Sequence, residues 1–475
     1  AHQTFPAMRR RETAPPSPAQ RPPRTAVIGG GAAGMAAAWL LAQAGLSVRL
    51  FEAKKHLGGR LGSFFDEPSG REIDRCQHLA LGCCSELLTF FDRLGLRRHW
   101  RRQREIYFAA SGGRAWRFRA NPFLPPPLHL LPGFLRLTFL SLADRLAILR
   151  AMFRLRKTSE EGTVKAWLLR QGQSPAAIRM FWEPVLLSAL SDSLDQASLA
   201  AARKVVVEGL MQSRRGFELH LPRLSLRRFW DGETAERLQA AGVQICRAAP
   251  VDALTPSASG WMLHLSNNAT EPFDAVVCAV PWRACVRLFE RSGQPLAAVM
   301  PACSAALPQP GEIIGLHLWF DRPGLALPNA ALLNTHSQWV FRLDDDQADS
   351  AGRDGKRSAT SAPEWYCQVV ISAAHAMPLP PITDLPAAAA RELGDVFPSL
   401  QSAQLVRWRV VREREAVYCP RPDWEARRPP QKTPLPRLAL AGDWTATGWP
   451  GTMEGAVRSG FSAAQAILAD LRAGS

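Results

Sequence analysis

The sequence predicts an α/β protein, and three observations lead to this fold class. A strand–glycine turn–helix–strand pattern begins near residue 25, short strands begin near residue 243, and a strand near residue 438 leads into a long helix. Of the 475 residues, 47% are hydrophobic and 21% are charged, which is typical of globular proteins. This composition excludes a fibrous or wholly disordered chain.

The N-terminal part predicts a tail followed by one βαβ unit. Residues 1–24 hold six Pro and five Arg and have almost nothing to bury, so we expect a disordered basic tail. A strand over 25–28 should then lead through a glycine-rich turn into a helix over 35–44. A second strand over 48–52 completes the unit.

The middle of the chain has a long region of helical pattern and, later, a short polar stretch. A Pro-rich lead runs into an apolar and basic helical pattern over 123–157, and residues 163–240 are also mostly helical in pattern. Residues 344–363 are small, polar and charged, which predicts a flexible insertion in a hairpin. A final helix is expected over 452–471. The remaining predicted strands are 243–246, 261–265, 275–280, 313–320 and 438–441.

The charge balance is strongly basic, with a formal net charge of +16 from 58 basic residues, of which seven are Lys. The Arg residues are scattered, and no helix-turn-helix or zinc-finger pattern accompanies them, so we expect no nucleic-acid partner. A diffuse positive field suits an anionic membrane surface at least as well. Docking would use apolar and basic residues of 123–157, although these apolar residues could instead be buried in the substrate domain; they are Phe123, Leu124, Leu130, Leu131 and Phe134 beside Arg136, Arg150, Arg154 and Lys157. No apolar stretch is long enough for a transmembrane helix.

The nine cysteines suggest neither a disulfide framework nor a metal site, because no pair has Cys-x-x-Cys spacing. We therefore expect a reducing, cytoplasmic location and no bound metal. No secretory signal is visible in the first residues.

The strongest local motif is Gly29-x-Gly31-x-x-Gly34, which follows a strand and opens a helix. Glycines at this spacing, with Ala33 in the same turn, allow a dinucleotide pyrophosphate to approach the backbone at the helix N-terminus. Glu52 ends the next strand, where an acid would accept hydrogen bonds from ribose hydroxyls. The alternative is a glycine-rich turn without a ligand.

Two further blocks point to the same cofactor chemistry. Gly58-Gly59-Arg60 would let the backbone run beside phosphates, with Arg60 as counter-charge. At the other end of the chain, Gly442-Asp443 could bind a ribityl chain, and a helix starting near Thr452 would direct its dipole at a flavin ring, with Met453 as a candidate cofactor-binding residue. Either block could instead be an ordinary loop.

Together these blocks resemble the flavin-containing amine oxidase and phytoene desaturase superfamily. Within it, the chain most resembles the hydroxysqualene dehydroxylases of squalene and hopanoid biosynthesis. The segments that carry this narrower likeness are 73–82, 181–190, 221–225, 316–321 and 440–445. The family usually shows Asp-Asn-Gly-Gln-His, whereas this chain has Arg75 and Cys76 in the second and third places.

The resemblance implies FAD as cofactor and a Rossmann-like FAD-binding domain assembled from three segments, with an α+β substrate domain inserted. It places the backbone of Val251 against the adenine. The 442–453 block has neither Cys nor His, so we expect non-covalent FAD. The implied FAD-binding segments are 25–105, 222–303 and 430–472, and the substrate-domain segments are 106–221 and 304–429.

The implied reaction is reductive removal of the hydroxyl of hydroxysqualene, a long apolar isoprenoid, to give squalene. His78 is the first candidate for the acid that meets this hydroxyl, although it could equally be a structural histidine. Glu183 is the second, because a buried Glu could be held neutral, although it could instead be a helix-start residue. Stretches 123–153 and 181–190 could line an apolar tunnel or form ordinary core.

Other functions remain open at this point. An oxidative desaturase of a polyprenyl substrate fits the same residues. An amine oxidase fits less well, because the strand over 313–320 lacks the Lys that this family typically places near the flavin. A flavin-bearing scaffold at the membrane is a non-enzymatic alternative. One dinucleotide motif implies an external electron donor. The substrate class implies a peripheral location on the inner membrane face, with upstream squalene-pathway enzymes as possible partners.

Overall fold

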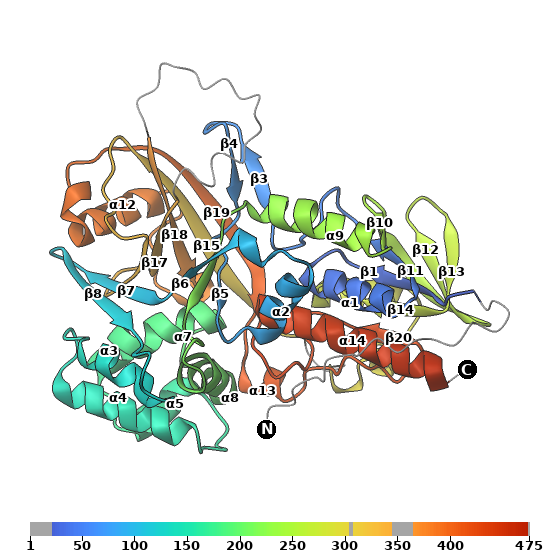
Figure 1. The fold of residues 1–475 in the computed structure, drawn as a ribbon, viewed down its shortest axis with the longest axis horizontal. Coiled ribbons are helices and arrows are strands. Elements are labelled where there is room, and N and C mark those ends of the chain that lie inside the picture. Colours follow the sequence, from blue (N-terminus) through green and yellow to red (C-terminus); the bar gives the residue numbers. More distant parts are fainter. Residues whose placement is uncertain (1–20, 304–306, 344–363, 474–475) are drawn as a thin grey trace.

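The computed structural model describes residues 21–303, 307–343 and 364–473 (Figure 1). Most of the predicted tail and the predicted insertion at 344–363 lie outside these ranges. Two large sheets organise the molecule, one of five strands and one of seven. The five-stranded sheet and its helices lie on the right of Figure 1, the seven-stranded sheet on the upper left, and a group of helices on the lower left.

The five-stranded sheet is parallel and has the order β10-β2-β1-β14-β20. Its strands come from three distant parts of the sequence, as the predicted strands required. Their central residues are buried apolar side chains, because helices cover the sheet. The strands are β1 (Arg24–Ile28), β2 (Ser47–Phe51), β10 (Gln244–Cys246), β14 (Ala275–Cys278) and β20 (Leu438–Leu440).

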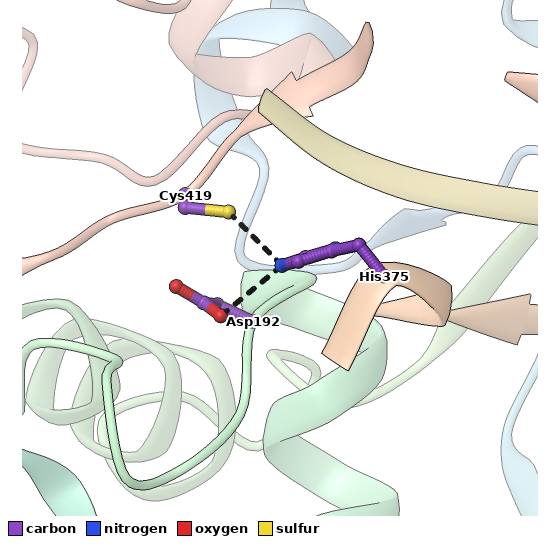
Figure 2. A group of neighbouring side chains, drawn as sticks. All are labelled: Asp192, His375 and Cys419. Atoms are coloured by element: carbon purple, nitrogen blue, oxygen red, sulfur yellow. Dashed lines mark hydrogen bonds and ion pairs between the residues drawn. The ribbon is translucent and has the colours of Figure 1, made fainter. Parts of the chain in front are cut away.

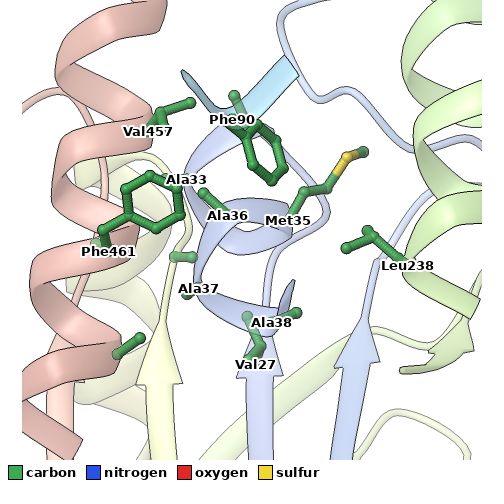
Figure 3. Packing of buried hydrophobic residues seen from close by; sticks show 14 of the residues in the cluster. Val27, Ala33, Met35, Ala36, Ala37, Ala38, Phe90, Leu238, Val457 and Phe461 are labelled. Carbon is green, nitrogen blue, oxygen red and sulfur yellow. The ribbon is translucent and has the colours of Figure 1, made fainter. Parts of the chain in front are cut away.

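Helix α1 (Ala32–Gln43) lies beside α14 (Met453–Ala473), and both helices pack against strands of the sheet (Figure 3). Gly460 of α14 permits this close approach, since a Cβ there would lie 2.2 Å from the carbonyl oxygen of Ala33. The ring of Phe461 of α14 packs edge to face against Phe90 of α2 (Ser85–Arg93). Helix α9 (Ala235–Ala240) contributes Leu238 to the same core.

An antiparallel sheet of β11 (Val251–Ser257), β12 (Gly260–Leu265) and β13 (Thr270–Phe273) follows β10 in the sequence. After β14 the chain enters α10 (Trp282–Arg291) and α11 (Leu296–Val299). The predicted strands over 243–246, 261–265 and 275–280 are therefore confirmed, with ends displaced by one or two residues. The domain boundaries themselves stay a prediction.

The seven-stranded sheet has the order β19-β15-β18-β17-β16-β7-β8. One face of β15 is apolar and belongs to the same core as α12 (Leu385–Val396), while Gly315 and His317 lie on the other face. The strands are β7 (Glu105–Ala110), β8 (Arg114–Arg119), β15 (Pro310–Phe320), β16 (Asn329–Leu332), β17 (Trp339–Arg342), β18 (Trp365–Ser372) and β19 (Leu405–Tyr418).

Two small sheets connect these parts. A hairpin of β3 (Ser63–Asp66) and β4 (Arg71–Asp74) lies beside the seven-stranded sheet. The second small sheet has the order β5-β9-β6, with β5 (Ala80–Leu81), β6 (Trp100–Gln103) and β9 (Leu219–Pro222). Strand β9 interrupts the stretch over 163–240 that the sequence predicted as mostly helical.

The remaining helices form a separate core around Trp167, Trp182 and Phe134. They include π-helical turns at Ile178–Trp182 and Lys204–Met211. Among the helices of the described ranges, none combines the length and apolar character needed to cross a bilayer. The helices are α3 (Leu131–Leu135), α4 (Leu142–Leu155), α5 (Val164–Arg170), α6 (Pro175–Ala177), α7 (Glu183–Leu190) and α8 (Leu199–Arg203).

Candidate functional site

The glycine turn lies between β1 and α1, at the carboxyl end of the parallel sheet. Gly29 has φ +107°, and a Cβ on Gly34 would lie 1.9 Å from the carbonyl oxygen of Gly29, so the turn needs both glycines. Gly31 caps α1 without a side-chain hydrogen bond, and a Cβ there would meet nothing within 4 Å. The first amides of α1 therefore face open space, as anion binding requires. Ala33, in the first turn of α1, is buried against α14, and a contact of its amide with the cofactor stays a prediction.

Glu52 directly follows β2 and is held rigidly beside this turn. Its Oε2 accepts a hydrogen bond from the Gly30 amide at 2.7 Å, and its Oε1 accepts one from the Lys54 amide at 2.9 Å. The residue is 8% exposed. Each oxygen of the Glu52 carboxylate can accept a further hydrogen bond, so this side chain is suited to hydroxyl donors such as those of a ribose.

The second block touches the first. The Gly58 amide donates to the Gly30 carbonyl at 2.8 Å, and a Cβ on Gly59 would lie 3.4 Å from the Gly31 Cα. Arg60 extends from this loop, where its Nη2 pairs with Asp443 and its Nη1 donates to the Ala416 carbonyl at 2.8 Å. Arg60 thus joins the glycine turns to β19 and to the C-terminal block.

The C-terminal block lies between β20 and α14. The Gly442 amide donates to Ser459 Oγ at 2.8 Å, and Asp443 is 3% exposed. Met453 begins α14, one residue after the predicted start, and packs on the core beside α1. Both Asp443 and the start of α14 are thereby fixed relative to the glycine turn.

Arg428 is a residue of this block that the sequence did not reveal. Its guanidinium donates to the carbonyls of Trp449 at 2.7 Å and Asp443 at 2.8 Å, and also to the Thr445 carbonyl. It is 7% exposed and pairs with Glu425. Arg428 therefore fixes the conformation of the 443–449 loop by hydrogen bonds from its buried side. It lies in no periodic or motif pattern, so only the fold shows its role.

Val251 is the first residue of β11, and its neighbourhood adjoins Glu52. The Ala249 amide donates to the Glu52 carbonyl at 2.9 Å, and the Glu52 amide donates to the Cys246 carbonyl at the same distance. The start of β11 is thus placed beside the carboxyl end of β2. A contact of the Val251 backbone with an adenine remains a prediction.

The glycine turn after β1, Glu52, the loop over 58–60 and the turn at Gly442-Asp443 together form a cofactor cradle, and this cradle fits a flavin dinucleotide. Open amides at α1, a buried carboxylate at the end of β2, and an Arg–Asp pair between two loops supply the donors and acceptors that its phosphates and hydroxyls need. Residues that would hold FAD are Gly29, Gly31, Gly34, Glu52, Gly59, Arg60, Gly442 and Asp443.

His78 lies near this cradle, since the Arg60 guanidinium and the Glu413 carboxylate of β19 both act on its charge. Its Nδ1 is 2.8 Å from the Cys76 carbonyl, which can only accept, so Nδ1 carries the proton. Burial lowers the pKa of His78, and the ring is therefore neutral with a free lone pair on Nε2. This geometry suits a hydrogen-bond acceptor for a hydroxyl better than an acid.

Glu183 begins α7 in the helical part of the molecule. Burial raises its pKa, while Lys165 and Arg179 lower it. Lys165 and Arg179 lie in the helical part of the molecule. The charged groups that act on His78 are Arg60 of the cradle and Glu413 of β19. The two candidate catalytic residues therefore have different surroundings.

Asp74 is a buried acid that the sequence analysis did not single out. Its Oδ1 accepts from Ser63 Oγ at 2.6 Å and from the Leu226 amide at 2.8 Å, whereas Oδ2 is buried without a hydrogen-bond partner. Burial raises the pKa of Asp74 to about 7. Asp74 can therefore hold a proton near neutral pH, four residues before His78. Asp74 ends the charged strand β4, so no apolar pattern in the sequence marked it as buried.

One group of metal-binding residue types occurs within the described ranges, formed by Asp192, His375 and Cys419 (Figure 2). His375 Nε2 lies 3.3 Å from Asp192 Oδ1 and 3.6 Å from Cys419 Sγ. His375 Nδ1 accepts the Glu312 amide at 3.3 Å, so the ring proton is on Nε2. Arg421 already pairs with Asp192 at 2.9 Å.

This arrangement is unfavourable for a metal ion, which needs the Nε2 lone pair and a thiolate, because burial raises the pKa of Cys419. It is also unlike a nucleophilic triad, in which the two ring nitrogens serve different partners. The geometry supports a hydrogen-bonded junction. It ties the turn after α7 to the ends of β18 and β19.

Comparisons with known proteins agree with the geometry. A family model described as flavin containing amine oxidoreductase matches residues 32–468. Hydroxysqualene dehydroxylase of Rhodopseudomonas palustris is 29% identical over 472 residues, which is 94% of this chain and 99% of the relative. A 15-cis-phytoene desaturase of an Oncidium hybrid cultivar is 26% identical over 489 residues, which is 95% of this chain and 78% of the relative.

Solved structures show the same fold at lower identity. A crystal structure of an oxidoreductase from Methanosarcina mazei has a TM-score of 0.67 at 17% identity, over 93% of this chain and 100% of that chain. Because the family model spans nearly the whole folded region, the chain belongs to the flavin containing amine oxidoreductase family and is a FAD-dependent oxidoreductase.

Proposed function

We propose that the protein reductively removes the hydroxyl group of hydroxysqualene to give squalene. The observation that carries this choice is the neutral ring of His78, which offers a free Nε2 lone pair near the cofactor cradle. A substrate with a single hydroxyl needs one such acceptor, whereas desaturation of a hydrocarbon needs none. Relatives that carry the name hydroxysqualene dehydroxylase support the same substrate.

The reaction replaces a carbon–oxygen bond by a carbon–hydrogen bond, and the hydroxyl leaves as water after gaining a proton. Reduced FAD supplies the hydride when it is bound. His78 Nε2 accepts the substrate O–H and thereby orients the carbon–oxygen bond. Because His78 is neutral, the proton must come from another group. Asp74 can hold that proton at Oδ2 near neutral pH, as its raised pKa of about 7 indicates.

The test is anaerobic incubation of the flavin-reduced protein with hydroxysqualene, followed by identification of the products. We expect squalene to form as the flavin absorbance recovers. His78→Gln should lower kcat/KM without releasing flavin. Formation of a more unsaturated product by the oxidised protein from a polyprenyl hydrocarbon would instead support the desaturase alternative. Absence of squalene from a fully reduced, flavin-loaded protein would refute the proposal.

We further propose that the protein docks on an anionic bilayer, in which such a substrate dissolves. Apolar side chains project from one face of α4, where Leu142 is 59% exposed, Leu146 54% and Phe153 44%. Phe123 on the preceding loop is 88% exposed. The expectation that Leu130 and Phe134 belong to this surface is wrong, because they are 5% and 2% exposed and pack in the helical core.

Exposed basic residues lie in the same region, namely Arg136, Arg150, Arg154 and Lys157. Apolar side chains can enter the headgroup boundary while each basic residue contributes about 1 kcal/mol near anionic lipid. Co-sedimentation with liposomes should therefore rise with anionic lipid and fall with salt. Arg150→Glu should weaken it, whereas Arg391→Glu on the exposed side of α12 should not. Equal binding by both variants would refute this docking surface.

A further inference from the structure

A cavity of about 550 Å³ lies between helix α10 and the chain that runs from residue 307 into the start of β15. The helix contributes Arg283, Val286 and Arg287 to the lining, and the facing chain contributes Leu307, Pro308 and Pro310. None of the residues that line this cavity, which we call the α10 cavity, belongs to the cofactor cradle. Pockets that hold small molecules have volumes of roughly 300 to 1,000 Å³, so the α10 cavity is large enough for a ligand.

Both walls of the α10 cavity are held in place by the fold. The Cys419 amide donates to the Gln309 carbonyl at 2.8 Å, and the next residue, Pro310, pairs with β19. On the other side, the inner face of α10 carries Trp282, which is 2% exposed and packs in one core with the five-stranded sheet. The cavity is therefore formed before a ligand arrives, which lowers the entropic cost of binding.

The helix wall of the α10 cavity carries two positive charges. Arg283 and Arg287 are four residues apart, so both side chains lie along one face of α10. Arg283 pairs with Glu415 of β19 at 2.7 Å, but the two side chains are 46% and 45% exposed, and such an exposed pair is weak. Among the described residues, Arg287 has no ion-pair partner. The cavity can therefore offer two guanidinium groups to an anion.

The facing wall of the α10 cavity is mostly apolar. Leu307 is 37% exposed there, between the prolines and Val286 of the helix. Guanidinium groups bind phosphate and carboxylate oxygens through pairs of parallel hydrogen bonds. Two of them on one wall match the double charge of a phosphate monoester better than the single charge of a carboxylate. The lining thus suits a ligand that combines a phosphate with an apolar body.

We propose that the α10 cavity binds a phosphate monoester carried on an apolar chain. Arg283 and Arg287 hold the phosphate, and Leu307 and the two prolines contact the chain. Glu415 competes with the phosphate for Arg283 and thereby weakens binding. The ligand is either a soluble phosphate ester or the headgroup of a phosphate lipid, and the two sources share this chemistry. The inference does not depend on the reaction proposed above, because its test measures binding alone.

The experiment is isothermal titration calorimetry of decyl phosphate into the flavin-loaded protein, in which FAD occupies the cradle and keeps the probe out of it. We expect decyl phosphate to bind more tightly than inorganic phosphate, which lacks the chain, and than decanol, which lacks the phosphate. Arg287→Gln should weaken decyl phosphate binding at least about tenfold, because hydrogen bonds between charged groups are lost. Glu415→Gln should tighten it, because Arg283 becomes free and a repelling carboxylate is removed.

Arg291→Gln and Asp252→Asn are the matched controls. Arg291 lies one turn further along α10 and pairs with Asp252 at 3.3 Å, and neither residue lines the cavity. Both controls should leave the affinity for decyl phosphate unchanged. Equal affinities of Arg287→Gln and Arg291→Gln overturn the proposal, as does binding of inorganic phosphate or decanol as tightly as decyl phosphate.

Sedimentation with phosphatidic acid vesicles distinguishes the two sources of the ligand. If Arg287→Gln sediments less than Arg291→Gln, the lipid headgroup is the ligand. If the two variants sediment equally while Arg287→Gln binds decyl phosphate more weakly, the ligand is a soluble phosphate ester.

Discussion

Replacing Arg428 by methionine should loosen the loop over 443–449 and weaken flavin binding together with stability. The change keeps the length of the side chain and removes its donors. Three backbone carbonyls, those of Asp443, Thr445 and Trp449, and the Thr447 hydroxyl then lose a hydrogen bond. At roughly 1 kcal/mol for each bond, and with Glu425 left without its buried partner, we expect a loss of about 3–5 kcal/mol in the free energy of unfolding.

Urea unfolding in excess FAD and flavin titration of the folded variant measure the two effects separately. Arg427→Met is a control at the adjacent position, because Arg427 pairs with the largely exposed Asp423 and should lose less than about 1 kcal/mol. Equal stability and equal flavin affinity for the two variants would show that Arg428 does not shape the loop.

Three further outcomes follow from the site. Glu52→Ala should weaken FAD binding by roughly 1–3 kcal/mol, and an unchanged dissociation constant in flavin titration would remove Glu52 from the site. Heat precipitation should release the flavin into the supernatant, because the 442–453 block has no Cys or His for covalent attachment; flavin retained in the pellet would contradict this. Burial raises the pKa of Asp74 from 3.8 to about 7, so the folded state binds this proton more tightly and loses stability as pH rises through that window. Asp74→Asn should flatten this fall in urea unfolding between pH 4 and 7, and an unchanged slope would mean that Asp74 titrates normally.

The sequence predicted the cradle well because its signals are local. Glycine spacing after β1, an acid after β2 and a Gly-Asp pair after β20 can each be recognised within a few residues, and the fold brings them together. Strand ends were predicted to within a few residues for the same reason, since buried parallel strands are continuous apolar runs.

Residues that act through distant partners could not be predicted. Arg428 is one of many scattered Arg residues, and only the fold places its guanidinium against the carbonyls of Asp443, Thr445 and Trp449. The junction of Asp192, His375 and Cys419 draws on three elements with no common spacing. Leu130 and Phe134 failed as docking residues because apolar composition does not distinguish a membrane-facing side chain from a core side chain.

The sheet that carries the cradle has a consequence for how the protein is made. Strand β14 pairs with β20, and Arg60 pairs with Asp443, which lies 383 residues later in the chain. A ribosome must therefore synthesise most of the polypeptide before β20, the second partner of β14, and Asp443, the partner of Arg60, exist, and until then one edge of β14 is unpaired. FAD cannot be fully enclosed by the nascent chain. Cofactor loading is thus a late step, and chains interrupted before residue 443 would expose this edge and be prone to aggregation.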